Sequence, residues 1–250
     1  MSYYDRALEL KDELIENRRY LHSHAEAGLT LPNTVAYVEK KLREYGIEPV
    51  RCGEGVTALI GKGGKVLLLR ADMDALEMPE ESGLAFASMN PQTAHCCGHD
   101  MHAAMLLTAA KMLKEHESEL QGTVKLMFQP GEECNPGGAS LVLAEKPFEG
   151  YDVRAVVGEH VEPQLEVGTL GFRAGKYMAA SDELRFRVRG TGGHGAMRKQ
   201  LKDPVAAGAE LLTRLIALNG EECVLSIGRV EAGGATNIVP DEIYMEGTLR

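Results

Sequence analysis

The chain has 250 residues, of which 44% are hydrophobic and 26% charged, and its formal net charge at pH 7 is −10. This length can bury one large core or two smaller ones, and the acidic balance argues against nucleic acid as a partner. No apolar run approaches the ~20 residues of a membrane span and the charged N-terminus is unlike a signal peptide, so we expect no membrane partner.

The first two thirds of the chain alternate between predicted helices and predicted strands. Apolar residues either recur at helical spacing or form short runs bounded by turn residues. Helices are expected at 4–22, 32–45, 103–113 and 137–143, and strands at 57–60, 66–69, 124–128 and 153–157. This alternation predicts an α/β fold with a mainly parallel sheet, in which the carboxyl ends of the strands meet at one edge.

The pattern changes in the last third of the chain. Residues 182–189 alternate between apolar and charged side chains, which is typical of a strand with one solvated face. A glycine-rich loop at 190–195 is followed by a predicted helix at 204–218 and predicted strands at 223–230 and 243–249. We therefore predict a larger α/β domain over residues 1–170 and a small α+β domain over residues 171–250.

The densest set of chemically active side chains lies in the segment His95–His102, which holds three histidines, two cysteines and an aspartate. These ligand types suit zinc, manganese, cobalt or nickel. Gly98 permits a tight turn that lets Cys97 and His99 face one ion, and the positive end of the following helix favours the thiolate of Cys97. A redox role for Cys96 and Cys97 is the alternative, although redox pairs usually have the spacing Cys-x-x-Cys. Since the five cysteines are odd in number and scattered, we expect a reducing, cytoplasmic location.

Three predicted strands end in further acidic or imidazole side chains. They are Asp72 and Asp74, Glu132 and Glu133, and Glu159 and His160. Ligands of open α/β sheets bind outside the carboxyl ends of the strands, so these side chains and the segment His95–His102 are expected to converge. Adjacent carboxylates in an irregular segment point in different directions. One glutamate of the second pair can therefore bind a metal while the other acts as a general base toward water.

Five motifs occur in a fixed order along the chain. They are Arg70-Ala-Asp-Met-Asp-Ala-Leu, His95-Cys-Cys-Gly-His-Asp-Met-His, Phe128-Gln-Pro-Gly-Glu-Glu, Glu159-His-Val and Gly192-Gly-His-Gly-Ala. This set resembles the dinuclear metal amidohydrolases that include hippurate hydrolase, N-acyl-amino-acid deacylases and auxin-conjugate hydrolases, which are relatives of the aminoacylase and glutamate carboxypeptidase peptidases. The resemblance extends from about Asn17 to Arg250.

The resemblance implies metal-dependent hydrolysis of the amide bond of a small-molecule N-acyl amino acid or a small peptide. It implies two divalent ions, Mn2+ or Zn2+ with Co2+ or Ni2+ as alternatives, and a homodimer formed through a ferredoxin-like lid domain. By position, it implies metal ligation by Cys97, His99, Glu133 and His160, a general base at Glu132, an orienting acidic pair at Asp72 and Asp74 with Asp72 preferred as catalytic, and substrate binding by His194 of the lid.

The C-terminal end departs from the family pattern. Family members continue past the position of Arg250, complete the lid and return to the catalytic domain, where the returning segment supplies a last histidine ligand. The resemblance therefore implies a C-terminally truncated chain with an incomplete lid. We expect either hydrolysis with Glu132 as the general base or a catalytically inactive relative that binds a metal or a peptide.

Overall fold

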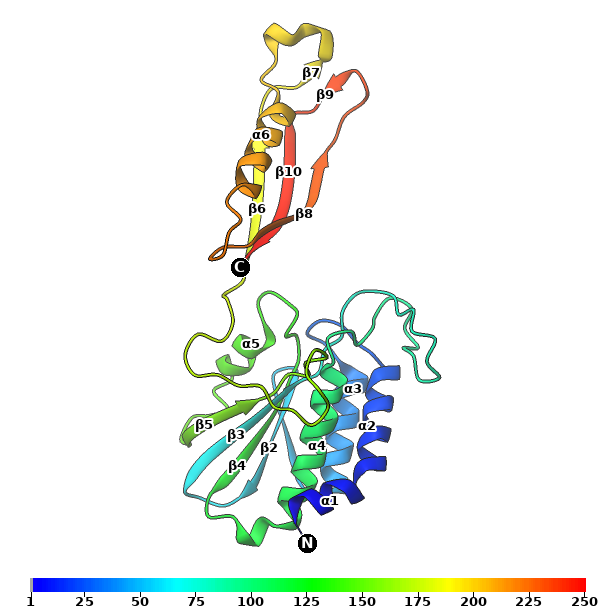
Figure 1. The fold of residues 1–250 in the computed structure, drawn as a ribbon, viewed down its shortest axis with the longest axis vertical. Helices are drawn as coiled ribbons and strands as arrows, with labels where there is room; N and C mark the ends of the chain where they lie inside the picture. The colour runs from blue at the N-terminus through cyan, green and yellow to red at the C-terminus, as the bar shows by residue number, and fades with distance from the viewer. Residues whose placement is uncertain (1) are drawn as a thin grey trace. The chain divides into compact units, whose positions relative to one another are not determined.

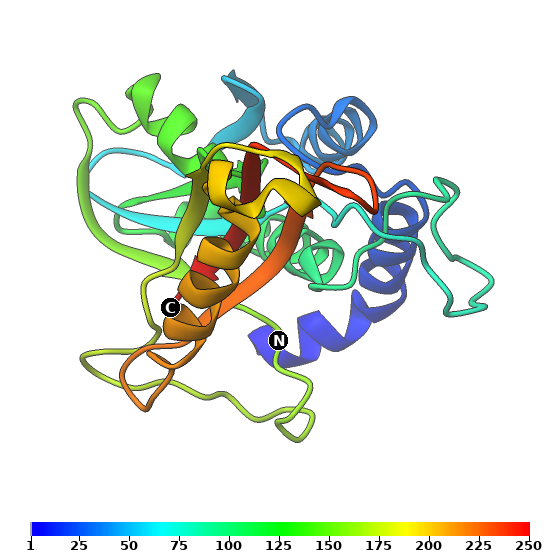
Figure 2. The ribbon, with the colours of Figure 1, turned by 90° about the horizontal axis from the view of Figure 1, so that it is seen from above.

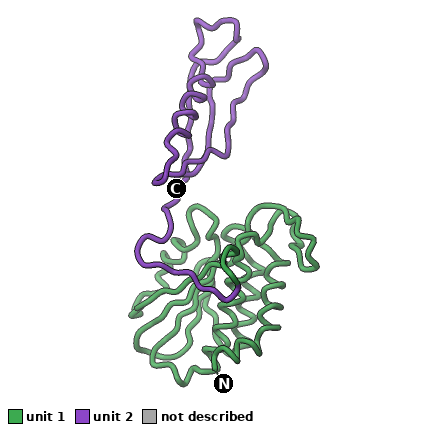
Figure 3. Tube along the Cα trace, viewed as in Figure 1, with its two compact units in different colours: residues 1–166 green, residues 167–250 purple. Residues whose placement is uncertain are grey.

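The computed structural model describes residues 2–250, which form two compact units divided between Glu166 and Val167 (Figure 3). Each unit has its own sheet and its own helices. The roles of catalytic domain and lid, which the sequence assigned to residues 1–170 and 171–250, stay predictions. No helix within residues 2–250 combines the length and the apolar character that a membrane crossing requires.

The first unit is built on a five-stranded sheet with the strand order β1-β2-β4-β3-β5. The strands are β1 (Pro49–Cys52), β2 (Gly55–Gly61), β3 (Lys65–Asp72), β4 (Thr123–Gln129) and β5 (Asp152–Gly158). β3 runs parallel to β4 and to β5, whereas β1 pairs with β2 and β2 pairs with β4 in antiparallel fashion. The α/β class is confirmed, and the sheet is mixed, with its parallel part at β4, β3 and β5. β1 was not predicted, because four residues are too few to show a strand period.

Helices cover both faces of this sheet (Figure 1). On one face lie α1 (Tyr3–Glu9), α2 (Lys11–Ser23), α3 (Pro32–Glu44) and α4 (His99–Glu115), and on the other lies α5 (Gly138–Ala144). Strand β4 shows how the sequence encodes the three layers. Its alternate side chains Val124, Leu126 and Phe128 belong to the core beneath α3 and α4, while Met127 belongs to a second core with Val142 of α5. All seven residues of β4 are buried, and the run 124–128 is apolar except for Lys125, whose Nζ donates to the backbone oxygen of Pro147.

The predicted helix over 4–22 is divided in two at Leu10. Leu10 ends α1 and begins α2 with φ −87° and ψ 2°, and it is buried. The turn lets α1 contact α4, where Arg6 forms an ion pair with Glu115 at 2.6 Å. A continuous apolar stripe on the two helices hid this break from sequence analysis.

The parallel strands bring their carboxyl ends to one edge of the sheet. Asp72 at the end of β3 pairs with Gln129 at the end of β4, and Gly158 ends β5 next to Arg70 of β3. The first turn of α4 starts at His99. Strand ends that are far apart in the sequence are therefore adjacent in the fold, as the sequence predicted.

The second unit is built around a three-stranded antiparallel sheet and the helix α6, which contacts all three strands (Figures 1 and 2). The sheet has the order β6-β10-β8, with β6 (Asp182–Arg189), β8 (Leu225–Ala232), β10 (Glu242–Leu249) and the helix α6 (Pro204–Ile216). The loop predicted at 190–195 contains a two-residue strand, β7 (Gly193–His194), paired with β9 (Ile238–Val239). A short 3-10 helix, Gly195–Gln200, follows it, and another, Glu117–Glu119, follows α4.

Candidate metal centre

His99 lies at the centre of the cluster and its two ring nitrogens have different environments. Nδ1–H donates a hydrogen bond of 2.8 Å to the backbone oxygen of Asp74. Nε2 is buried and has no hydrogen-bond partner among the described residues. Carboxylate oxygens of Asp72 and Glu133 lie 3.8 Å from Nε2, and one of Glu132 lies 4.0 Å away. Since Nδ1 donates to a backbone oxygen, Nε2 is the nitrogen that remains available to a metal, and it is directed toward this group of acids.

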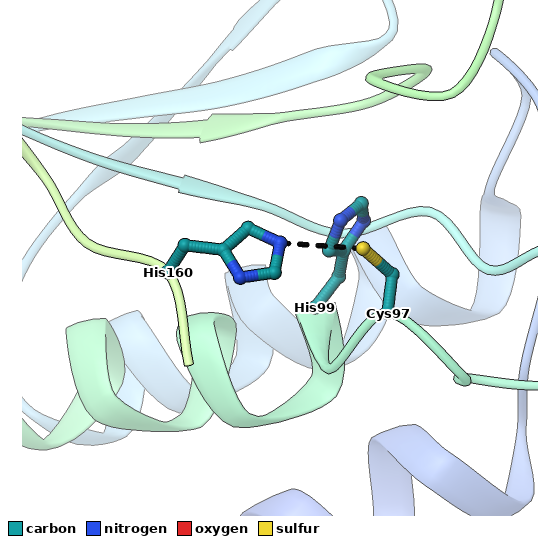
Figure 4. Close-up of side chains that lie close together, drawn as sticks. All are labelled: Cys97, His99 and His160. Carbon is teal, nitrogen blue, oxygen red and sulfur yellow. Dashed lines mark hydrogen bonds between the residues drawn. The ribbon is translucent and has the colours of Figure 1, made fainter. Parts of the chain in front are cut away.

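Cys97 and His160 approach the same place from two other segments (Figure 4). The Sγ of Cys97 lies 3.2 Å from Nε2 of His160. One donor atom from each of Cys97, His99 and His160 lies within 4.8 Å of the others. Gly98 makes this possible, because its φ of +91° is left-handed and a Cβ at this position would lie only 2.4 Å from Cγ2 of Val161.

The turn that carries Glu132 and Glu133 is held by the carboxylate of Asp74. The backbone N–H groups of Glu132 and Glu133 donate to Oδ1 and Oδ2 of Asp74 at 2.9 Å and 3.0 Å. Asp74 thus fixes both the ring of His99 and the start of the acidic turn. The side chains of the two glutamates remain 43% and 29% exposed, so solvent reaches both carboxylates. Burial, followed by the charge of Glu133, raises the pKa of Glu132.

Asp72 and His102 form a second hydrogen-bonded pair beside His99. Nδ1–H of His102 donates to Oδ1 of Asp72 at 2.6 Å, and Nε2 of His102 accepts from the N–H of Val161 at 2.9 Å. The other oxygen of Asp72 accepts from Arg70 at 2.6 Å. Burial alone would raise the pKa of Asp72, but His102 and Arg70 lower it to about 2. Because His102 contacts both Asp72 of β3 and the backbone of Val161, this pair holds the segment with His160 in place relative to β3.

These donors fit a divalent transition metal. Cys97, His99 and His160 form one group of three, and His99, Glu132 and Glu133 form another that shares the imidazole of His99. Thiolate, imidazole and carboxylate together are typical ligands of zinc and its neighbours in the first transition row. A buried imidazole nitrogen without a partner is costly unless a ligand satisfies it.

The thiolate expected of Cys97 is not the favoured form while no metal is bound, and metal ligation by Cys97 stays a prediction. Burial and the carboxylate of Glu133 raise the pKa of the Cys97 thiol to about 12. Burial and the neighbouring carboxylates therefore favour the neutral thiol in the absence of a metal ion. A divalent cation among these acids would reverse the balance, because it favours the deprotonated thiol.

The structure brings together six of the residues that the sequence singled out. They are Asp72, Cys97, His99, Glu132, Glu133 and His160. His194 lies on β7 in the second unit, where its Nδ1 accepts a hydrogen bond of 3.2 Å from the N–H of Ala196. His95 belongs to none of the possible metal-binding groups in residues 2–250, and burial lowers its pKa to about 4.

Sequence analysis did not identify the role of His102 or the dual contacts of Asp74. A signal for His102 was present, because residues three apart share one face of a helix and His102 follows His99 by three positions. The carboxylate of Asp74 accepts hydrogen bonds from the backbone N–H groups of Glu132 and Glu133. Hydrogen bonds to backbone atoms cannot be predicted from the identities of the side chains.

Residues 68–241 match the family model described as peptidase family M20/M25/M40. The chain belongs to this family. The M20 relatives include an N-acetyl-L-cysteine deacetylase of Bacillus subtilis, 37% identical over 96% of this chain and 60% of the relative. They also include an N-acyl-L-amino acid amidohydrolase of Geobacillus stearothermophilus, 37% identical over 97% of this chain and 68% of the relative. The resemblance inferred from the five motifs is confirmed.

Solved M20 structures support the same assignment. A dinuclear metal binding peptidase of family M20 from Bacillus subtilis superposes with a TM-score of 0.76 at 37% identity, over 96% of this chain and 64% of that one. A putative aminohydrolase from methicillin-resistant Staphylococcus aureus gives a TM-score of 0.83 at 32% identity, over 98% and 65%. The chain thus spans about 60–68% of the length of these relatives.

Proposed function

We propose that this M20 protein catalyses metal-dependent hydrolysis of the amide bond of N-acyl amino acids or small peptides. The observation that carries the proposal is the buried, unpartnered Nε2 of His99, which faces carboxylates of Glu132 and Glu133 within 4.0 Å. Two M20 relatives that are 37% identical are named as a deacetylase and an amidohydrolase of N-acylated amino acids, which supports this substrate class.

We infer that Cys97, His99, Glu133 and His160 hold two divalent ions, Mn2+ or Zn2+ with Co2+ or Ni2+ as alternatives. A bound divalent ion lowers the pKa of water and polarises a carbonyl oxygen, which is the chemistry that amide hydrolysis needs. The mixture of thiol, imidazole and carboxylate donors supports a transition metal and argues against calcium or magnesium, which prefer oxygen ligands alone.

Glu132 is the proposed general base. Its carboxylate is exposed enough to meet a water molecule, and its raised pKa moves it toward the range in which a base takes up a proton efficiently. In the proposed reaction, Glu132 accepts a proton from the attacking water and returns it to the leaving amine. Asp74 acts as a positioning residue in this scheme, because it fixes the turn that presents Glu132.

Asp72 also positions the site in this proposal. Asp72 is buried, and each of its carboxylate oxygens already accepts a hydrogen bond, from His102 or from Arg70, so the side chain is held by these two residues and shielded from solvent. This arrangement favours an orienting role for Asp72 over direct participation in the reaction.

The second unit contributes His194 to this proposal. Its imidazole would bind the substrate carboxylate or stabilise the oxyanion that forms when the carbonyl is attacked. The unit is the proposed lid, and the homodimer formed through it stays a prediction. All five cysteines are free, which supports the proposed cytoplasmic location.

Hydrolysis of a substrate panel tests the function. Hippurate and several N-acetyl amino acids, including N-acetyl-L-cysteine, are incubated with the metal-free protein and with the protein supplied with Mn2+, Zn2+ or Co2+. The proposal predicts release of free amino acid only in the presence of metal. Metal binding without turnover of any substrate would contradict it and would favour the alternative, a catalytically inactive relative that binds metal or peptide.

A further inference from the structure

A second buried cluster of charged side chains lies outside the metal-ligand group. His22 of α2 is 6% exposed at its side chain and stands between two carboxylates, Asp100 of α4 and Glu80 of the loop after β3. The side chain of Asp100 is fully buried and that of Glu80 is 8% exposed. Arg18, one turn earlier on α2, lies 2.7 Å from the same oxygen of Asp100. The metal-ligand group uses none of these side chains.

Each ring nitrogen of His22 faces a different segment of the chain. Nδ1 lies 2.8 Å from Oδ2 of Asp100, and Nε2 lies 3.1 Å from Oε1 of Glu80. Only the imidazolium form can donate to both carboxylates at once. The hydrogen bond to Asp100 raises the pKa of His22, which favours this form. His22 thereby joins α4 to the loop.

Both partners of His22 are connected to proposed metal ligands. Asp100 is the residue after His99 in the first turn of α4. Glu80 organises residues 77–93, which contain no helix or strand and lead through Ala94 to Cys97. Its Oε2 accepts from the N–H of Ser88 at 2.6 Å. The carboxylate of Glu80 thus stabilises the conformation of the loop that leads to Cys97.

The end of α2 is the support for this loop. The N–H of Met89 donates to the backbone oxygen of Ser23 at 2.9 Å, and the hydroxyl of Thr93 donates to the backbone oxygen of Ala25 at 2.8 Å. His22 adds a charged connection that reaches α4 as well as the loop. Arg18 lies beside it, 2.7 Å from Asp100 and with its guanidinium 4.9 Å from the ring centroid of Phe86 in the same loop. Buried ion pairs contribute little to net stability compared with apolar packing, whereas removal of one partner leaves an uncompensated buried charge.

We propose that His22, together with Glu80, is a positioning element for metal binding that sets the placement of Cys97 relative to His99. The inference rests on the proposed metal site. Residues that orient ligands without touching the metal typically change metal affinity 10–100-fold when they are replaced. His22→Asn and Glu80→Ala are therefore expected to raise the dissociation constant for Co2+ by about 10–100-fold.

Two matched controls separate this role from general damage. Glu81→Ala removes the neighbouring exposed glutamate of the same loop, and His24→Asn removes the histidine at the C-cap of α2, which contacts Tyr20 and Ser23. Both are expected to leave the Co2+ dissociation constant within about twofold of the unchanged protein. Thermal unfolding without metal reports stability for every variant.

The measurement is a Co2+ titration against a competing chelator, with the thiolate-to-cobalt absorption band as a second readout. Weaker Co2+ binding and a weaker band in His22→Asn and Glu80→Ala, with both controls unchanged, would support the inference. Unchanged binding in both variants, while Glu133→Ala binds Co2+ less well, would overturn the inference and leave the metal site intact. No binding by the unchanged protein would overturn the proposed metal site and this inference with it. Glu80→Ala keeps the test decisive if His22→Asn fails to fold, because Glu80 lies in an irregular segment.

Discussion

The hydrogen bonds of Asp72 illustrate how single residues set the electrostatics of the site. Burial would favour the neutral acid, yet His102 and Arg70 hold the carboxylate ionised with a pKa of about 2. A group whose pKa is lower in the folded than in the unfolded protein stabilises the fold above its unfolded pKa, which is about 3.9. This stabilisation is lost as the pH falls toward 2.

Asp72→Asn is therefore expected to be less stable than the unchanged protein by roughly 2 kcal/mol or more at pH 6. The difference should shrink between pH 4 and pH 2, where the carboxylate of the unchanged protein takes up its proton. Urea unfolding of the unchanged protein and of Asp72→Asn, both without metal and at several pH values, measures this difference in the free energy of unfolding. Asp152→Asn, at an exposed ion pair with Arg154, is the control and should change stability little. A difference that does not vary with pH would contradict the expectation.

A second prediction for a single residue concerns the thiol proton of Cys97. Its thiol has a pKa of about 12 without metal, so ligation must displace a proton from it. Calorimetric Co2+ titrations in buffers of different ionisation enthalpy should show about one proton fewer released by Cys97→Ala than by the unchanged protein. Cys96→Ala removes the adjacent exposed thiol and should release as many protons as the unchanged protein. Equal release by all three proteins would show that Cys97 does not bind as a thiolate.

Residue identity and spacing predicted which side chains meet at the site but not how each one is used. Cys97, His99 and His160 were expected together because the carboxyl ends of parallel strands share one edge, and the structure places them together. The protonation of Cys97 without metal could not be predicted, since it depends on burial and on the distances to carboxylates that follow another strand. Long-range distances of this kind have no signature in the local sequence.

At the scale of elements, the junction before α4 combines backbone conformation and packing. Gly98 is the N-cap of α4 with a φ of +91°, and a Cβ added to it would lie 2.4 Å from Cγ2 of Val161. Any other residue at this position would strain the backbone and push the segment after His160 away. Both effects would separate Cys97 and His99 from His160.

Gly98→Ala is expected to lower the free energy of unfolding by roughly 2–4 kcal/mol, from left-handed strain and the clash together. Gly83→Ala is the matched control, because Gly83 has a φ of +67° but nothing within 4 Å of the added Cβ. It should cost about 1–2 kcal/mol. The double variant Gly98→Ala with Val161→Ala should recover part of the difference. Equal losses in Gly98→Ala and Gly83→Ala would mean that the contact with Val161 has no effect.

The elements with the longest periodic patterns were predicted well. Expected helices at 32–45 and 204–218 correspond to α3 and α6, and the alternation at 182–189 corresponds to β6. Strand pairing was harder to predict, because β2 lies next to β4 instead of β3 and runs antiparallel to it. Nothing in an apolar strand distinguishes its two edges, so this order follows from packing of the whole sheet.

At the scale of the whole molecule, all proposed metal ligands belong to the first unit. Cys97, His99, Glu133 and His160 precede Glu166, and the two buried apolar clusters of the first unit lie between Leu21 and Val153. The fragment of residues 1–166 is therefore expected to fold and to bind Co2+ with a dissociation constant within a few-fold of that of the whole chain. Circular dichroism and a chelator competition titration test this expectation. A folded fragment without Co2+ binding would show that the second unit supplies a ligand.

Glu132 is the proposed base of a metal-dependent amide hydrolysis by this chain. The most direct measurement compares the unchanged protein with Glu132→Gln for metal content and for turnover of N-acetyl amino acids in the same preparations. We predict equal metal content and a loss of turnover by at least about 100-fold, because the amide cannot accept the proton of water. Turnover retained by Glu132→Gln at equal metal content would show that Glu132 is not the base.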